Sequence, residues 1–340
     1  MRGDDFVKAM ICREYGPPET LVLGDMPDPG APGTGEVLIG VEYAGVSFVD
    51  ALKLRNLHQN KNVLPFIPGG EVAGRVLAVG PGVTGVAAGD HVAALVRGGG
   101  YAEQALAACT ECFVLPEGIA ATEGAALLGS GLTAYVALTE SARTGGGENV
   151  VISGATGGIG LLAVQIAKAL GATVIAVVGS PHKVSVALEH GADFGIDAGH
   201  QSLRDRIREI TRGEGADVVL DQVGGPFADN PTSLLAWGGR YVIVGFAGGA
   251  IPRFDGNRLL VKNRSAVGMV LGYYRQRRTD ILRRAGTELL AMIGDGRVRP
   301  LISEVAPLEQ APRLLRQIMD RRMLGKAVLA VPGGAGEAAD

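Results

Sequence analysis

Cysteine is scarce in this sequence, with three among 340 residues. Three thiols are too few for the disulfide framework of a small secreted domain. Cys109 and Cys112 form a C-x-x-C pattern, but no second such pair and no histidine pair completes a tetrahedral metal site. We therefore interpret these two cysteines as packing residues of an apolar, β-like segment at 105–115.

Long apolar runs are also missing. Gly, Pro or a charged residue interrupts every apolar stretch well short of the roughly 20 residues that a membrane span needs. Residues 1–8 mix both signs of charge and lack the apolar core of a signal peptide. We expect a soluble protein of the cytoplasm, without a membrane partner.

An excess of charge of one sign is absent as well. The net charge of −3 gives no general attraction to nucleic acid or to anionic lipid. Arginines cluster at 275–278 and 283–284 beside two tyrosines, a pattern that could follow a nucleic-acid backbone. Because arginines on one face of a surface helix are usually solvated or ion-paired, we expect no nucleic-acid partner.

Glycine, in contrast, is abundant. The chain has 53 glycines, more than twice the average share of about 7%. They lie between short β-branched runs, as expected where many strands end in tight turns or where a ligand approaches the backbone. With 47% hydrophobic and 20% charged residues, a chain of this length can form two globular domains with separate cores.

The two parts of the chain differ in the secondary structure that their sequence patterns predict. Residues 36–43 and 73–79 alternate like half-buried strands, and turn signals recur about every 10 residues, which predicts a compact, barrel-like β domain. After a helical stretch at 122–139, apolar strands alternate with helices. This alternation predicts an α/β fold with a parallel sheet covered on both faces. The expected strands are 150–152, 173–178, 216–220 and 240–245, and the expected helices are 159–170 and 182–190.

The last part of the chain is expected to be helical at 279–294 and 308–322 and to end in a strand at 327–331. The tail at 333–340 is rich in Gly, Ala and acidic residues, and we expect it to be disordered.

The most informative motif is VVISGATGGIG at 150–160, which leads from a strand through a glycine turn into an apolar helix. In this context glycines allow the backbone to approach a pyrophosphate, and the N–H groups at the start of the helix stabilise its charge. Ala155 replaces the first glycine of the usual G-x-G-x-x-G, and Gly160 allows the helix to lie close to the sheet. The predicted diphosphate-binding residues are Ala155, Thr156, Gly157, Gly158 and Ile159.

The end of the second strand indicates which dinucleotide binds. NAD sites usually place an acid there for the ribose hydroxyls. Here Ser180 and Lys183 follow the strand, and no acid stands at its end. Because a 2′-phosphate requires a hydroxyl donor and a cation, we predict NADPH as the cofactor, although Lys183 could instead be a solvated helix residue.

Six segments together resemble the zinc-free NADPH:quinone oxidoreductase (zeta-crystallin-like) branch of the medium-chain dehydrogenase/reductase superfamily. They are AGVSFVD at 44–50, PGGEVAG at 68–74, GDHV at 89–92, GLTA at 131–134, GATGGIG at 154–160 and GK at 325–326. The resemblance implies a GroES-like, β-barrel-type catalytic domain formed by 1–121 and 268–332. It places a Rossmann-fold, doubly wound NADPH-binding domain at 122–267 and a substrate cleft between the two domains. It also implies a homodimer joined through an apolar strand near 265–271.

By this resemblance, the positions that hold a catalytic zinc in related alcohol dehydrogenases are Ser47, Gly70 and Ser130 here. None of them offers a soft ligand, and residues 91–105 lack the cysteines of a structural zinc lobe. We therefore predict no metal. Without a Lewis acid, quinones and conjugated carbonyls are better acceptors than simple ketones, because conjugation spreads the developing charge.

The candidate catalytic residues are Ser47, His58 and Ser130, which could polarise the acceptor oxygen. His58 could also deliver a proton, but it lies in a polar loop where a solvated histidine is an equal interpretation. Beside the glycine turn and Ser180 and Lys183, the resemblance suggests further cofactor contacts at Thr133, Gly245, Phe246, Asn263 and Arg321. An enoyl or enone reductase and a non-catalytic NADPH-binding or nucleic-acid-associated protein stay open as alternatives.

Overall fold

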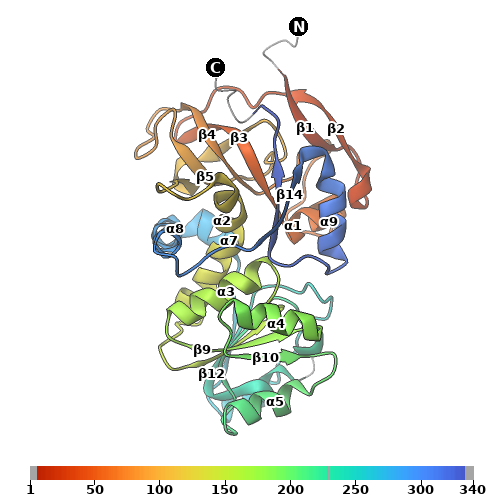
Figure 1. Cartoon of the computed structure of the whole chain (residues 1–340), viewed down its shortest axis with the longest axis vertical. Helices are drawn as coiled ribbons and strands as arrows, with labels where there is room; N and C mark the ends of the chain where they lie inside the picture. The colour runs from red at the N-terminus through yellow and green to blue at the C-terminus, as the bar shows by residue number, and fades with distance from the viewer. Residues whose placement is uncertain (1–5, 228–229, 334–340) are drawn as a thin grey trace. The chain divides into compact units, whose positions relative to one another are not determined.

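A computed structural model describes residues 6–227 and 230–333 (Figure 1). The chain forms two compact units. The first contains the chain up to Gly129, Thr279–Gly294 and the part that begins at Pro300, and the second contains Ser130–Arg278 and Asp295–Arg299. The first change of unit falls inside helix α2 (Ala121–Val136), later than the boundary at 121 that the sequence suggests.

The second unit is built on a six-stranded sheet of the described chain, in the order β10-β9-β8-β11-β12-β13. All of its pairings are parallel. The order reverses between β8 and β11, which is the doubly wound arrangement that the sequence predicts, so this expectation is confirmed. The strands are β8 (Asn149–Ser153), β9 (Thr173–Val178), β10 (Phe194–Asp197), β11 (Ala216–Asp221), β12 (Leu235–Ile243) and β13 (Ser265–Gly268).

Helices connect these strands and cover both faces of the sheet. The central strands are therefore buried along almost their whole length. A cluster of apolar side chains from Val151, Ile175, Ile196 and Val219 packs against Ile207 of α5. The helices of this unit are α3 (Gly158–Ala169), α4 (Pro181–Glu189), α5 (Leu203–Ile210), α6 (Gly256–Leu260) and α7 (Leu271–Arg277), with shorter turns η3 (Ala137–Ser141), η4 (Gly225–Phe227) and η5 (Pro231–Leu234).

The first unit is a β-rich body with a seven-stranded sheet in the order β14-β15-β3-β4-β5-β7, in which β6 also pairs with β3. Its pairings are antiparallel except β14 with β15. A separate two-stranded sheet joins β1 to β2. The strands are β1 (Phe6–Cys12), β2 (Leu21–Pro27), β3 (Glu36–Val46), β4 (Glu71–Val79), β5 (His91–Leu95), β6 (Gln104–Ala108), β7 (Cys112–Val114), β14 (Ile302–Pro307) and β15 (Lys326–Ala330).

Strand β15 explains how the end of the chain completes this unit. It pairs with β3, so that Ala327 lies opposite Val46 near the end of β3. Residues almost 300 positions apart in the sequence therefore become neighbours in one sheet. The helices of the unit are α1 (Phe48–Leu54), the first part of α2, α8 (Thr279–Gly294) and α9 (Ala311–Met319), with short turns η1 (Pro18–Thr20), η2 (Cys109–Glu111) and η6 (Leu308–Gln310).

The C-x-x-C segment lies in this unit, and its second cysteine packs in the interior. Cys112 is fully buried, and burial raises the pKa of its thiol to about 12. Arg283 of α8 donates hydrogen bonds to the backbone carbonyls of Cys112 (2.7 Å) and Cys109 (3.3 Å) and lies over the Phe113 ring. The interpretation of Cys112 as a packing residue is confirmed.

Two predictions about secondary structure need correction. A third prediction, about the tail, falls mostly on residues outside the described chain. Strand β10 was missed, because a segment of four residues with an internal glycine gives a weak strand signal. The apolar strand expected at 265–271 ends at Gly268, and Leu271 already begins α7. Of the tail expected to be disordered, Gly333 lies in a turn, and 334–340 are outside the described residues.

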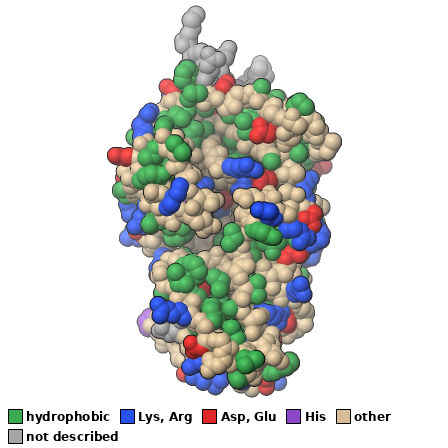
Figure 2. All heavy atoms as spheres, turned by 180° about the vertical axis from the view of Figure 1, so that it is seen from behind, with side chains coloured by type: hydrophobic (Ala, Val, Ile, Leu, Met, Phe, Trp, Pro, Cys, Tyr) green, Lys and Arg blue, Asp and Glu red, His purple; other side chains and the backbone are tan. Residues whose placement is uncertain are grey.

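The surface agrees with the balanced composition. On the face that Figure 2 displays, Lys and Arg side chains are interspersed with Asp and Glu rather than gathered by sign. Among the helices that the structure describes, none is both long enough and apolar enough to cross a bilayer.

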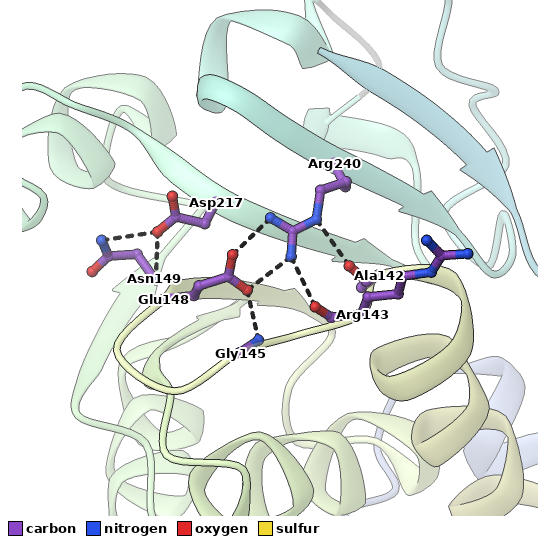
Figure 3. Close-up of polar contacts among 7 residues, drawn as sticks. All are labelled: Ala142, Arg143, Gly145, Glu148, Asn149, Asp217 and Arg240. Carbon is purple, nitrogen blue, oxygen red and sulfur yellow. Dashed lines mark hydrogen bonds and ion pairs between the residues drawn. The ribbon is translucent and has the colours of Figure 1, made fainter. Parts of the chain in front are cut away.

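One ion pair lies at the amino ends of the parallel strands in the second unit's sheet (Figure 3). Arg240 of β12 donates to both carboxylate oxygens of Glu148, each at 2.8 Å, and to the carbonyl of Ala142 at 2.9 Å. Glu148 also accepts the Gly145 N–H at 2.9 Å. The hydrogen bonds from Arg240 hold the pKa of Glu148 below its ordinary value. The loop before β8 is thereby joined to Arg240 in the second half of β12.

The Arg240→Met variant tests this pair. At pH 7 we expect the second unit to lose about 1–2 kcal/mol of stability, a modest loss because solvent reaches and screens both side chains. A carboxylate with a lowered pKa stabilises the fold above its unfolded pKa of about 4.3 and stops doing so as pH falls through its folded pKa. Thermal unfolding of variant and wild type should therefore differ at pH 7 and converge below about pH 4. A gap that stays constant across this range would contradict the assignment.

Candidate functional site

The glycine turn lies at the carboxyl end of β8, at the point where the strand order reverses. We refer to the edge formed by the carboxyl ends of the parallel strands as the carboxyl edge. Gly154 has φ +56°, a left-handed conformation that favours glycine. A Cβ on Gly160 would lie 2.2 Å from the Gly154 carbonyl oxygen, so only glycine allows α3 to begin this close to the turn. The spacing role predicted for Gly160 is confirmed.

A buried carboxylate on the neighbouring strand braces this turn. Asp221, at the end of β11, is fully buried and accepts the Ser153 hydroxyl at 2.7 Å and the Val223 N–H at 2.9 Å through Oδ1. The Gly224 N–H lies 3.0 Å from Oδ1, and the Tyr241 hydroxyl donates to Oδ2 at 2.6 Å. Burial, and after it the charge of Asp221, raises the pKa of Tyr241, so this phenol stays a hydrogen-bond donor.

Gln222 completes the brace. Its side-chain amide donates to the carbonyls of Ser153 (2.8 Å) and Gly154 (3.3 Å), and its backbone N–H donates to the Ser153 hydroxyl at 3.0 Å. Asp221, Gln222 and Tyr241 support the candidate site, and the sequence analysis missed them. The available signal was an acid at the end of a buried strand, followed three residues later by a Gly-Gly pair.

The residues of the turn fit a dinucleotide diphosphate. The first N–H groups of α3 have no acceptor within the helix, and Gly157 carries no side chain in front of them. A Cβ at Gly157 would meet only the Gly154 carbonyl oxygen, at 3.4 Å. The structure thus brings together the predicted residues 155–159 in one turn and helix start, where Ala155 is fully buried and Thr156 is 4% exposed.

The end of β9 lies beside this turn, as the parallel pairing of β8 and β9 requires. Ser180 is the residue before α4, and Lys183 lies in the first turn of that helix; both are partly exposed. The Ala155 N–H donates to the Val177 carbonyl at 3.2 Å, which links the turn to β9. The predicted ligands of the diphosphate and of the 2′-phosphate therefore follow adjacent strands.

Gly245 and Phe246 follow β12 and also lie at the carboxyl edge. The N–H groups of Val244 and Gly245 donate to the Asp221 carbonyl, at 2.8 and 3.3 Å, and Phe246 is 42% exposed. Asn263 lies elsewhere. It is an exposed residue just before β13, and the Gly238 N–H donates to the neighbouring Lys262 carbonyl, which places Asn263 at the amino ends of the strands. Because those ends face away from the glycine turn, we do not carry Asn263 into the proposed site.

In the first unit, Ser47 stands between β3 and α1. Asp50 of α1 is 1% exposed and accepts both the N–H (3.0 Å) and the hydroxyl (2.9 Å) of Ser47. It also accepts the Tyr101 hydroxyl at 3.0 Å and the Gly69 N–H at 3.2 Å. Burial, followed by the charge of Asp50, raises the pKa of Tyr101. In this arrangement the only hydroxyl proton of Ser47 is directed at Asp50, so the oxygen offers lone pairs to a ligand.

A buried ion pair holds the neighbouring segments. Lys326 at the start of β15 pairs with Glu71 at the start of β4, and both side chains are 4% exposed. Glu71 also accepts the Gly129 N–H at 2.7 Å, while Lys326 donates to the Val46 carbonyl at 3.1 Å. A Cβ on Gly129 would lie 2.9 Å from Glu71 Oε2, so the glycine makes room for the carboxylate. This pair fixes the backbone immediately before Ser47 and Ser130.

The remaining candidates are placed as follows. His58 is partly buried in its loop, where its Nδ1 accepts the Asn60 N–H at 3.1 Å, a contact within its own turn. Ser130 and Thr133 lie on α2 with 8% and 9% exposure. Arg321 follows α9 in the first unit with φ +58° and is exposed. Their predicted roles stay predictions.

Among the described residues, no group of three or more His, Cys, Asp and Glu side chains is placed to hold a metal ion. A Cβ on Gly70 would meet no atom within 4 Å, so open space lies beside this position.

Comparison with known proteins covers nearly the whole chain. The sequence model of the alcohol dehydrogenase GroES-like domain matches residues 33–144, and that of the zinc-binding dehydrogenase matches residues 158–286. The chain is 35% identical to quinone oxidoreductase-like protein 2 homolog of Nematostella vectensis, over 96% of this chain and 90% of the relative. It is 33% identical to the quinone oxidoreductase of Rattus norvegicus, over 96% and 98% of the two chains.

Solved structures agree with the described fold. A mycobacterial protein complexed with NADPH is 30% identical, with a TM-score of 0.88 and coverage of 95% of this chain and 99% of the other. The Escherichia coli quinone oxidoreductase complexed with NADPH is 29% identical, with a TM-score of 0.86 and coverage of 96% and 99%. An NAD-dependent alcohol dehydrogenase is 28% identical, with a TM-score of 0.85 and coverage of 95% and 99%. The expected GroES-like and Rossmann-type domains are confirmed.

The Lys326→Met variant tests the buried pair of the first unit. Removal of the ammonium leaves the Glu71 carboxylate buried without its counter-ion, and we expect a loss of about 3–5 kcal/mol in the unfolding of this unit. Adding Glu71→Gln, which removes the charge but keeps an oxygen for the Gly129 N–H, should recover much of that loss. The matched control is Lys262→Met, which removes an exposed lysine. Urea unfolding measures all four proteins, and a double variant no more stable than Lys326→Met would contradict the account.

Proposed function

Because the chain belongs to the quinone oxidoreductase branch of the medium-chain dehydrogenase/reductase superfamily, we propose that it transfers a hydride from NADPH to a quinone or a similar conjugated carbonyl. The observation that carries this proposal is the glycine turn at the carboxyl edge, which fits a diphosphate and is braced by Asp221. A bound reduced nicotinamide supplies the hydride, while the protein binds and orients the reactants.

The choice of NADPH is supported by the residues at the end of β9. Ser180 offers a hydroxyl and Lys183 a cation, which a 2′-phosphate requires, and β9 ends without an acid. Two similar structures, the mycobacterial protein and the E. coli enzyme, contain NADPH. The first N–H groups of α3 would receive the diphosphate, and Gly245 and Phe246 lie at the same edge.

The choice of a conjugated acceptor is supported by Ser47 and Gly70 of the first unit and by Ser130, with which the second unit begins. Ser47, Gly70 and Ser130 provide hydroxyls and open space rather than metal ligands. Since the Ser47 proton is directed at Asp50, Ser130 is the remaining serine that could donate a hydrogen bond to the acceptor oxygen. One neutral donor gives limited stabilisation to an alkoxide, but it suits an oxygen whose charge is spread by conjugation. We propose that the reaction proceeds without a metal.

The decisive experiment follows NADPH oxidation at steady state with ortho-quinones, para-quinones, conjugated enones and simple ketones. We expect conjugated acceptors to be reduced at least about 100-fold faster than a simple ketone, a difference of roughly 2.7 kcal/mol in the barrier. The ranking of quinones against enones separates a quinone reductase from an enone reductase.

Elemental analysis of the same preparation provides the control for the metal. A stoichiometric zinc together with rapid turnover of simple ketones would refute the proposed chemistry. NADPH binding without turnover of any acceptor would instead favour a non-catalytic protein.

We also propose a homodimer joined through β13. This strand ends the described sheet, and its residues are alternately half-buried and exposed, which leaves an edge open for a second copy. Light scattering in solution should give twice the chain mass. The Met269 N–H donates to Ile243 of β12, so by alternation the Ala266 N–H faces the open edge, and Ala266→Pro should shift the mass towards the monomer. A monomeric wild-type protein would contradict this proposal.

A further inference from the structure

An acid that the sequence analysis did not consider lies near the end of β9. Strand β10 ends at Asp197, which is in register with Val178 of β9, and the Ala198 N–H donates to the Val178 carbonyl at 2.9 Å. A Cβ on Gly199 would lie 3.8 Å from the Gly179 carbonyl oxygen. The turn at 197–200 is therefore directly beside the turn that leads to Ser180.

Such an acid should oppose NADPH. A phosphate monoester carries about −1.5 to −2 charges at pH 7, so a bare carboxylate beside it is repulsive, whereas the same carboxylate suits a ribose hydroxyl. The absence of an acid at the end of β9 therefore does not by itself decide between NADPH and NADH, because the neighbouring strand β10 supplies Asp197.

His200 offsets this acid. Its Nδ1 lies 2.7 Å from Asp197 Oδ2, while the Gly199 N–H donates to Oδ1 at 3.0 Å. The hydrogen bond with His200 holds the pKa of Asp197 below its ordinary value. Both carboxylate oxygens thus have donors, and the acid is satisfied within its own turn.

The same contact orients the imidazole. The His200 side chain is 75% exposed, and its Nε2 has no partner among the described residues. A carboxylate on Nδ1 fixes the direction of the ring, so that Nε2 lies on the side away from Asp197. An imidazolium carries a proton on both ring nitrogens, and in that form Nε2 presents an N–H to a phosphate. Ser180, Lys183 and His200 then line the same part of the carboxyl edge.

We infer that His200 determines the choice of nucleotide: held by Asp197, it offsets that carboxylate and offers a donor to the 2′-phosphate, so that NADPH binds more tightly than NADH. This inference rests on the proposed function, because it assumes that the carboxyl edge binds a nicotinamide dinucleotide. It goes further in assigning the discrimination to a residue pair on β10 in addition to the hydroxyl and the cation after β9.

Fluorescence titration with NADPH and with NADH tests the inference without any turnover. The proteins are wild type, His200→Ala, Asp197→Asn with His200→Ala, and His190→Ala. His190 is a matched control, because it lies at the far end of α4 with its Nδ1 on the Val186 carbonyl. The substitutions change two histidines and one acid that lies at the start of a turn. A thermal unfolding midpoint equal to that of the wild type shows that each variant is folded.

We expect His200→Ala to raise the Kd for NADPH about tenfold, the size of one lost hydrogen bond to a charged group, and to change the Kd for NADH less than about twofold. The double variant should regain part of the NADPH affinity, since the uncompensated carboxylate is gone. His190→Ala should behave as wild type.

Equal weakening of both nucleotides would show a structural role for His200 and overturn the inference, as would no change at all. A double variant no better than His200→Ala would overturn the role of Asp197. Failure of the proposed function looks different: wild-type protein that prefers NADH, or that binds neither nucleotide, refutes the proposed cofactor before any variant is compared.

Discussion

Three buried carboxylates organise this protein, because a carboxylate removed from water must find donors and these donors are largely the backbone and hydroxyl groups of the site segments. Asp221 takes the Ser153 hydroxyl and two N–H groups beside the glycine turn. Asp50 takes both donors of Ser47, and Glu71 takes the N–H before Ser130. Each acid therefore fixes the position of one segment of the candidate site, the glycine turn, the start of α1 or the middle of α2.

The two units hold different segments of the candidate site in place. In the second unit, the glycine turn that we propose for the diphosphate cannot shift without breaking the contacts of Asp221 and Gln222. The first unit holds Ser47 and the open position at Gly70 through Asp50, and the backbone before Ser47 through Lys326. Precise placement of reactants accounts for much of what a protein can add when a cofactor carries the hydride.

The sequence predicted the periodic elements well because burial imposes a clear pattern on them. Strand β9 and helix α8 have the predicted bounds, and the glycine turn was located by its strand–turn–helix context. Contacts between distant segments left no such pattern. Glu71 and Lys326 are 255 positions apart, and the pairings of β15 with β3 and of β3 with β4 bring them together.

Two further positions illustrate the same point. Asn263 was suggested by resemblance alone, and a resemblance does not state at which end of a strand a residue lies. Asp197 lay in a strand too short to recognise, so its position beside the end of β9 was not foreseen. Both depend on the order and direction of strands in the sheet, which local sequence does not encode.

The central claim is that the turn between β8 and α3 receives the diphosphate of a reduced nicotinamide dinucleotide. A crystal structure of the protein soaked with NADPH tests it most directly. The account predicts diphosphate oxygens within hydrogen-bond distance of the N–H groups at the start of α3, with Asp221 still bonded to Ser153. A nucleotide bound away from this turn, or a turn closed against it by its own side chains, would contradict the account.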